Sequence, residues 1–269
     1  MRPEEETGLS RYERWNQLLD RLAERDAMTV EEAAEQLGVS LATIRRDFDE
    51  LARQHMLTRV RGGARRNSVA YDLPLRYKTA RHASEKQRIG VAAAGLIVAG
   101  ATVALNGGTT TTEVARAIAT RADLHDTRGE PTLTVVTNAL NISNELAVRP
   151  HVKIVLTGGV ARPQSYELLG PLATLVLETL TLDYAILGVD ALSAENGASA
   201  HHEGEASINQ LMARRSEHVM IVADGSKLGA RGFARICGTD QIDTLVTDTS
   251  APAAELDLLR DRGVRVVMA

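Results

Sequence analysis

Seven short apolar runs recur between residues 102 and 268, and they restrict most of the chain to a few architectures. Helix-like stretches lie between most of them, so strands and helices are expected to alternate, as in α/β domains. The runs are continuously apolar, which is typical of parallel strands covered on both faces of a sheet. The sequence therefore predicts a Rossmann-like α/β domain over residues 84–269. The predicted strands are TVALN (102–106), LTVVTN (133–138), KIVLTGG (153–159), DYAILGVD (183–190), VMIVADGSK (219–227), DTLVTD (243–248) and VRVVM (264–268).

The amino-terminal part lacks such runs and carries signals of short helices instead. The capping-box spacing occurs twice, in SRYE (10–13) and TVEE (29–32). Gly38 is expected to end the second helix, and Ser40 to cap the third. The segment LTRVRGGARR (57–66) then predicts a short strand, a Gly-Gly turn and a basic stretch.

The third predicted helix has one apolar face, because Ile44, Phe48 and Leu51 recur at the spacing of helix turns. One turn takes about 3.6 residues, so residues on the opposite side should point away from that face, with Arg45 on its flank. The outward-facing residues are expected to be Ser40, Thr43, Arg46 and Asp47.

Positive charge is concentrated on this helix and the strands after it. Residues 40–66 hold seven arginines against three acids, a net charge of +4, whereas residues 1–39 hold five arginines against ten acids, a net charge of −5. The macrodipole disfavours the cations Arg45 and Arg46 near a helix start unless a negative partner is bound. Such focusing is typical of a surface that binds nucleic-acid phosphates. A helix-turn-helix used for protein contacts is the alternative.

The segment GVSLATIRRDFDELARQHMLTRVRGGA (38–64) resembles the winged helix-turn-helix of the DeoR/GlpR family of bacterial transcriptional regulators. TIRRD and RVRGGA are the specific parts of the match. The resemblance implies a DNA-binding domain over residues 8–66, a linker over residues 67–83, and contacts of helix and wing with double-stranded operator DNA. The residues expected to serve the groove or phosphates are Ser40, Ala42, Thr43, Arg45 and Arg46, with Arg59, Arg61 and Arg65 on the wing.

Glycine and polar residues follow five of the predicted strands. In ALNGGTTTTEV, two glycines let the backbone approach a ligand, and the start of the following helix favours an anion. Thr110 and Glu113 have capping-box spacing, and a tight turn with a threonine cap is the alternative. Lys227 could supply a point charge for a phosphate, or be a solvated loop residue. Ligands of open α/β sheets bind outside the carboxyl ends of the strands. The residues expected to bind an effector are Gly107, Gly108, Thr109, Thr110, Thr111, Asn138, Gly158, Gly159, Asp190 and Lys227.

These motifs also resemble the effector domain of the DeoR family, which is similar in fold to ribose-5-phosphate isomerase and coenzyme A transferases. The resemblance implies repression of a carbohydrate-metabolism operon, relieved by a phosphorylated sugar or related metabolite. Asn106 stands where many members have Asp, which argues against proton-transfer chemistry. A sugar-phosphate isomerase is the alternative function, but the segment 188–197 lacks the compact acidic cluster that such chemistry needs. The segment HHEGE (201–205) could line the mouth of the site.

The remaining expectations come from composition. Cys237 is the only cysteine, so no internal disulfide can form, which fits a reducing cytoplasm. The amino-terminal MRPEEETG is too polar for a signal peptide, and the apolar part of the uncharged run 90–108 is too short and too broken by glycine to span a membrane. We expect a cytoplasmic homo-oligomer, dimeric or higher, with no catalytic residues, metal or cofactor.

Overall fold

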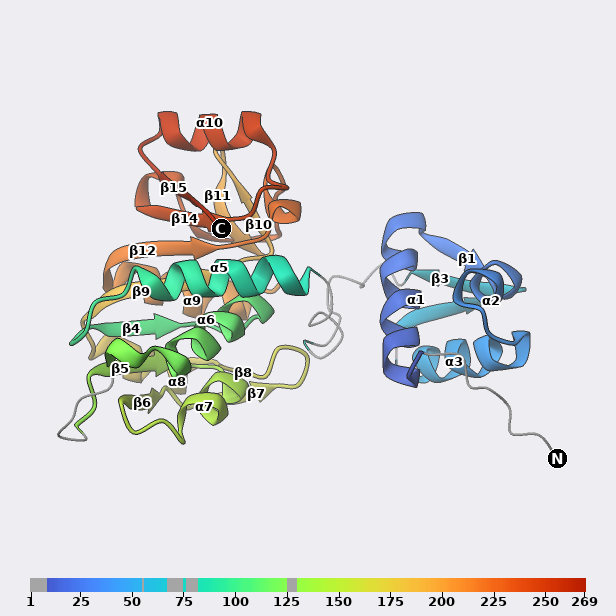
Figure 1. The fold of residues 1–269 in the computed structure, drawn as a ribbon, viewed down its shortest axis with the longest axis horizontal. Coiled ribbons are helices and arrows are strands. Elements are labelled where there is room, and N and C mark those ends of the chain that lie inside the picture. The colour runs from blue at the N-terminus through green and yellow to red at the C-terminus, as the bar shows by residue number, and fades with distance from the viewer. Residues whose placement is uncertain (1–8, 55, 67–74, 76–81, 125–129) are drawn as a thin grey trace. The chain divides into compact units, whose positions relative to one another are not determined.

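The computed structural model describes residues 9–54, 56–66, 75, 82–124 and 130–269. The internal contacts divide the chain into two units, Met1–Arg81 and His82–Ala269 (Figure 1). Most of the predicted linker, residues 67–74 and 76–81, lies outside the described residues.

The first unit packs three helices against a small antiparallel sheet. The sheet has the strand order β1-β3-β2, and the β2–β3 hairpin forms the predicted wing. The third strand of this sheet, β1, pairs with β3 and was not predicted, because it is only three residues long. The elements are α1 (Arg11–Arg25), β1 (Ala27–Thr29), α2 (Val30–Leu37), α3 (Leu41–Arg53), β2 (Leu57–Val60) and β3 (Gly63–Arg66).

The predicted helix ends of this unit are confirmed. Both capping boxes form, each with the hydroxyl of the N-cap residue accepting the backbone N–H three residues on. Gly38 ends α2 in the left-handed region at φ 65°, where glycine is favoured, and Ser40 caps α3. The predicted apolar face of α3 is fully buried, so burial of this stripe holds α3 on the other two helices. The largest fully buried side chains here are Leu18, Leu22, Ile44, Phe48 and Leu51.

The second unit is built on a seven-stranded sheet in which every pairing is parallel. Its order is β15-β14-β12-β9-β4-β5-β6, and its strands coincide with the seven predicted runs, which confirms the α/β prediction. The strands are β4 (Thr102–Leu105), β5 (Leu133–Thr137), β6 (Val152–Leu156), β9 (Leu182–Gly188), β12 (Ser216–Val222), β14 (Thr244–Thr247) and β15 (Arg265–Met268).

Helices cover both faces of this sheet. Alternate residues of each strand point to opposite faces, so Val103 and Leu105 join one core cluster and Ala104 joins the other. The helices on the first face, where Figure 1 shows α5 lying across the sheet, are α5 (Ala83–Gly95), α6 (Thr109–Thr120) and α7 (Leu140–Leu146). Those contributing to the other core are α8 (Pro171–Glu178), α9 (Glu203–Arg214) and α10 (Ala253–Asp261).

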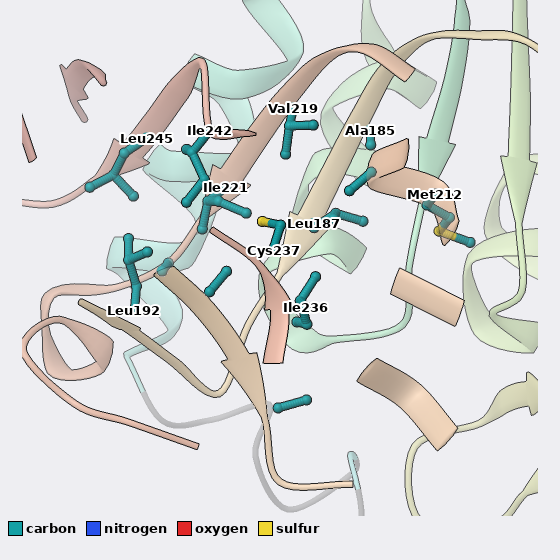
Figure 2. Packing of buried hydrophobic residues seen from close by; sticks show 14 of the residues in the cluster. Ala185, Leu187, Leu192, Met212, Val219, Ile221, Ile236, Cys237, Ile242 and Leu245 are labelled. Carbon is teal, nitrogen blue, oxygen red and sulfur yellow. The ribbon is translucent and has the colours of Figure 1, made fainter. Parts of the chain in front are cut away.

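In the described part of the second unit, five short strands outside the main sheet were not predicted. Three of them, β10 (Ala191–Ser193), β11 (Gly197–Ala200) and β13 (Ala234–Cys237), form a sheet that packs on the second core. Figure 2 shows Cys237 of β13 near Ile221 and Leu187 in this core. The other two, β7 (Val160–Arg162) and β8 (Glu167–Leu169), pair as a hairpin. In the part of the chain that the structure describes, no helix is long and apolar enough to cross a membrane.

The strand order reverses between β4 and β9. From β4 the sheet continues through β5 and β6 on one side, and through β9, β12, β14 and β15 on the other. Such a switch point is where open α/β sheets bind ligands, because the loops leaving the two central strands diverge there. The loops after β4 and β9 begin at Asn106 and Val189, so the switch point lies among the predicted effector residues.

Candidate functional sites

The first candidate surface is the exposed side of α3. Ala42, Arg45 and Arg46 are exposed, and Thr43 is half-buried. The Ser40 hydroxyl accepts the Thr43 N–H at 3.1 Å and lies 2.9 Å from the Thr43 hydroxyl, so both side chains stabilise the helix start. Within the described residues, no ion pair or hydrogen bond engages the guanidinium groups of Arg45 and Arg46. Both cations therefore face solvent at the positive end of the helix dipole.

Asp47 does not point outward as predicted. Its side chain is buried, at 3% exposure, and its carboxylate accepts hydrogen bonds from Trp15 Nε1 at 2.7 Å and Arg14 Nη2 at 3.1 Å. Arg14 Nε also binds it, and this hydrogen bond raises the pKa of the Arg14 guanidinium. The prediction was wrong because Asp47, three residues after Ile44 and four before Leu51, lies at the edge of the apolar face and not opposite it, and α1 supplies the donors that draw it inward. Asp47 thus neutralises Arg14 and leaves the charges of Arg45 and Arg46 uncompensated.

Arg59 is held inside the unit, whereas the other two predicted wing arginines are exposed. Arg59 Nε lies 2.8 Å from Asp49 Oδ1, its Nη1 donates to the Gly63 carbonyl at 2.7 Å, and its guanidinium lies 5.6 Å from the Phe48 ring centroid. It therefore ties the wing to α3. Arg61 is exposed in the turn, and Arg65 keeps 61% of its side chain exposed at 3.6 Å from Asp26.

The second candidate site is the turn after β4. The helix α6 starts at Thr109, and its N-cap is Gly108, which offers no side-chain cap. The predicted capping box of Thr110 and Glu113 is therefore wrong, because Thr110 already lies inside the helix. The backbone N–H groups of the first turn keep their capacity for an anion.

The threonines of this turn differ in what their hydroxyls can do. Those of Thr111 and Thr112 donate to the Gly108 carbonyl at 3.2 and 2.6 Å. Thr110 is buried, and Thr109 is half-buried. The threonine side chains thus fix the shape of the turn, and the backbone groups offer the binding capacity.

Asn106 joins the two central strands at the switch point. Its Nδ2 donates to the Gly188 carbonyl at 2.9 Å, and its Oδ1 accepts the Gly188 N–H at 2.8 Å. A carboxylate could only accept. The amide of Asn106 therefore has a structural role here.

A buried carboxyl that sequence reasoning missed lies against this turn. Glu167 of β8 is 2% exposed, and its Oε1 accepts the Gly107 N–H at 2.7 Å. A Cβ on Gly107 would lie 2.3 Å from Glu167 Cγ, so this glycine makes room for Glu167. Burial first, then repulsion by Glu205, raises the pKa of Glu167 to about 8. Nothing local in the sequence marks Glu167, because its partners are about 30 to 60 residues away along the chain.

The hairpin that carries Glu167 is hydrogen-bonded to the residues that follow β5. Leu168 N donates to the Asn138 carbonyl at 2.7 Å, and Leu140 N donates to the Tyr166 carbonyl at 2.9 Å. Asn138 Nδ2 reaches Glu167 Oε1 at 3.4 Å. At the other end of the hairpin, a Cβ on Gly159 would lie 2.8 Å from the Leu169 carbonyl. Gly107, Asn138 and Gly159 are thus brought together through the hairpin, and Gly158 precedes it in the left-handed region at φ 73°.

Asp190 and Lys227 come from neighbouring loops on the other side of the switch point. Asp190 Oδ2 accepts the His201 N–H at 2.9 Å, and His202 caps α9 through Nδ1. The half-buried Lys227 lies in a turn beside β10, where Gly229 N donates to the Leu192 carbonyl at 2.9 Å. Among the described residues, no group of three or more His, Cys, Asp or Glu could hold a metal ion.

Arg45 and Arg46 form an unpaired arginine face on a helix-turn-helix, and the same chain has a turn suited to a ligand at the switch point of its main sheet. Together these two features define the class of DNA-binding regulators with a sensor domain. Residues 14–70 match the sequence model of the DeoR-like helix-turn-helix domain, and residues 81–249 match that of the DeoR C terminal sensor domain. The chain belongs to the DeoR family of transcriptional regulators.

Curated relatives match nearly the whole chain. The "Putative aga operon transcriptional repressor" of Escherichia coli O157:H7 is 33% identical over 97% of this chain and 94% of its own length. The glycerol-3-phosphate regulon repressor of Escherichia coli K12 is 28% identical over 96% and 99%. Ribose 5-phosphate isomerase A of Methanocaldococcus jannaschii is 15% identical over 55% of each chain, with a TM-score of 0.40. The family favours a regulator over the isomerase alternative.

Proposed function

We propose that this regulator represses a carbohydrate-metabolism operon in the cytoplasm and that a phosphorylated sugar or related metabolite relieves the repression. Two relatives support the repression, because their names describe repressors of the aga operon and of the glycerol-3-phosphate regulon. The DNA-binding domain spans residues 8–66, the linker 67–83 and the effector domain 84–269. The chain works as a homo-oligomer, because a symmetric pair of reading heads matches a two-fold operator.

The observation that carries this proposal is the exposure of Arg45 and Arg46 on α3, while the acid beside them is buried and paired with Arg14. In a helix-turn-helix, the amino-terminal part of the second helix enters the major groove. Ser40, Ala42, Thr43, Arg45 and Arg46 lie in that part of α3. Arg61 and Arg65 extend the positive surface along the wing, and Arg59 holds the wing in place.

The test is DNA binding by the full chain and two matched variants. The probe is a duplex from the region upstream of its own gene, followed by fluorescence anisotropy. Arg46→Ala should weaken binding by about 1–3 kcal/mol if Arg46 contacts a base. Arg53→Ala removes the same charge from the other end of α3, where Arg53 pairs with Glu50, and should leave affinity nearly unchanged. Equal affinities for all three proteins would refute the assignment of α3 as the reading helix.

The effector site is the turn from Gly107 to Thr111 together with the neighbouring strand ends. Free backbone N–H groups at the start of α6 suit a phosphate. Asn138, Gly158, Gly159 and Asp190 shape the surrounding loops, and Lys227 supplies positive charge. For relief of repression, the metabolite must bind better to the arrangement of the chain that does not hold DNA.

A further inference from the structure

The helix α8 is apolar on its outer face as well as on its inner face. Its sequence, PLATLVLE, holds one charged residue, Glu178, at the last position. Ala173 and Leu177 are buried in the core, whereas Leu172 and Leu175, three residues apart and therefore neighbours on the opposite face, are 62% and 60% exposed. A helix that is apolar all round is typical of a buried position. The outer face of α8 thus has the composition of a covered surface.

The other helices on the same core carry charges on their outer faces. The exposed residues of α9 include Glu203 and Arg214, and those of α10 include Asp257 and Arg260. Single exposed apolar side chains are common on protein surfaces, but several that lie together mark a surface that binds a partner. The contrast with α9 and α10 therefore indicates that α8 is covered by something outside its own unit.

The apolar surface continues from α8 onto the hairpin β7–β8. Val160 of β7 is 71% exposed, and it pairs with Leu169 of β8, two residues before α8 begins. A Cβ on Gly159 would lie 3.2 Å from the Ala173 Cβ, so the start of β7 lies against α8. We name the exposed apolar side chains of this surface the α8 patch: Val160, Leu172 and Leu175.

The composition of the α8 patch suits a second copy of this chain. In a two-fold dimer a surface meets its own copy, so a patch with charges of one sign would repel itself, whereas an uncharged apolar patch does not. A stable interface takes about 800 Å² from each partner. Eight residues of helix are only about 12 Å long, so the interface needs the neighbouring hairpin as well as α8.

The position of Glu178 distinguishes the two ways in which a two-fold axis can pair these helices. Glu178 stands at the carboxyl end of its own helix, where the dipole disfavours an anion, and no ion pair engages it within the described residues. If the helices were parallel, the two Glu178 side chains would meet and repel each other. If they are antiparallel, each Glu178 lies beside the start of the partner's α8, where Gly170 supplies no side-chain cap and the dipole favours an anion.

We propose that the α8 patch is a dimer interface between two copies of this chain, in which the α8 helices run antiparallel, Leu172 of each copy packs against Leu175 of the other, and Glu178 lies at the start of the partner's helix. This inference rests on the proposed homo-oligomer and assigns its contact surface. The hairpin β7–β8 also contacts the Gly107 N–H through Glu167. The interface therefore adjoins the proposed effector turn.

The first experiment measures the mass of the full chain by sedimentation equilibrium over a range of concentrations. Leu175→Glu should raise the dimer Kd at least about 100-fold, because the substitution occurs twice and each new carboxylate would be buried without a partner. If the wild-type protein forms a larger assembly, loss of this contact should halve its mass. The matched control is Val148→Glu, which places the same charge at a valine that is 73% exposed after α7 and should leave the Kd unchanged.

The second experiment tests the antiparallel pairing and also shows that the variants are folded. Leu172→Lys alone should dissociate in the same way as Leu175→Glu. When the two variants are mixed in equal amounts, they should form a heterodimer, because the carboxylate of one copy then faces the ammonium group of the other. The mixture should therefore sediment as the wild-type assembly, although neither variant does so by itself.

Three results would overturn the proposal, each at a different level. A wild-type chain that stays a monomer at every concentration refutes the homo-oligomer itself. An oligomer of unchanged mass in Leu175→Glu refutes the interface at α8 and assigns the contact to another surface. A mixture that does not associate refutes the antiparallel pairing. DNA binding through Arg46 is measured separately, so a failure of this interface is distinguishable from a failure of the proposed function.

Discussion

Asp47 and Glu167 are both buried carboxyl groups, but the surroundings of Asp47 stabilise a negative charge and those of Glu167 disfavour one. Asp47 receives hydrogen bonds from Arg14 and Trp15, which stabilise its ionised form. Glu167 receives the Gly107 N–H but faces Glu205, so its neutral form is favoured. Neither arrangement could be predicted from the sequence. The helical period gives a residue's position around α3 but says nothing of donors on α1, and Glu167 has no neighbour in sequence that signals its partners.

Removal of the Asp47 carboxylate should destabilise the DNA-binding unit strongly. Asp47→Ala leaves the guanidinium of Arg14, which is 13% exposed, without its counter-charge. Loss of one partner of a buried ion pair costs about 3–5 kcal/mol. Asp49→Ala, two residues further along α3, removes an exposed partner of Arg59 and should cost at most about 1 kcal/mol. Urea unfolding of the full chain compares the two, and equal losses would contradict the structural role of Asp47.

The raised pKa of Glu167 should make stability fall as pH rises. Between its usual value of 4.5 and the folded value of about 8, the folded state holds a proton that the unfolded state has lost. Its contribution to the free energy of unfolding is therefore complete below about pH 4.5 and disappears as pH rises through about 8. The expected slope is at most about 1.4 kcal/mol per pH unit. The free energy of unfolding of Glu167→Gln, measured with urea, should lack this pH-dependent component. If the free energies of both proteins fall in parallel as pH rises, the prediction is contradicted.

At the scale of elements, the sequence predicts best what local chemistry decides. The seven strands of the main sheet were predictable because each is a continuous apolar run, and both capping boxes because three residues suffice to form one. The hairpin β7–β8 was not predictable, because each of its strands has only three residues and polar residues lie between them. Its register depends on contacts with the loop after β5. Tyr166 at φ 59° shows that tertiary contacts hold this hairpin in a backbone conformation that its sequence does not favour.

The connection between β4 and β9 should depend on the amide of Asn106. In the natural protein, Asn106 Nδ2 donates to the Gly188 carbonyl. In Asn106→Asp this donor is lost, and a carboxylate oxygen faces the same carbonyl. An unmet buried hydrogen bond costs about 1–3 kcal/mol. Asn144→Asp makes the same chemical change at an exposed position of α7 and should cost little. Thermal unfolding distinguishes the two variants, and a stable Asn106→Asp protein would remove the structural reason for this residue.

For the whole molecule, the division into two units separates two kinds of recognition. The arginine face lies in the first unit and the turn at Gly107 in the second, and each has its own hydrophobic core. The resemblance to the DeoR family predicted this division of roles. The sequence alone could not show that Arg59 is held within its unit, because that requires the approach of Asp49, Gly63 and Phe48.

Variants in the effector site should uncouple the two functions. Thr109→Ala and Lys227→Ala should bind operator DNA as tightly as the wild-type protein when no metabolite is present, because both positions lie in the second unit. Their response to a sugar phosphate should weaken, by about 1 kcal/mol or more if one hydrogen bond to the charged ligand is lost. A titration of the DNA complex with sugar phosphates measures this. A normal response in both would place the effector elsewhere.

The burial of Cys237 has a practical consequence. It is the only cysteine of the chain, and burial raises the pKa of its thiol to about 11, so almost none of it is the reactive thiolate at neutral pH. The thiol of the natural protein therefore reacts very slowly with maleimides. Cysteines introduced at Glu31 and Val148, exposed positions in the two units, would accept a fluorophore pair with little background. Energy transfer between the dyes could then follow the separation of the reading head from the sensor as metabolite and operator are added.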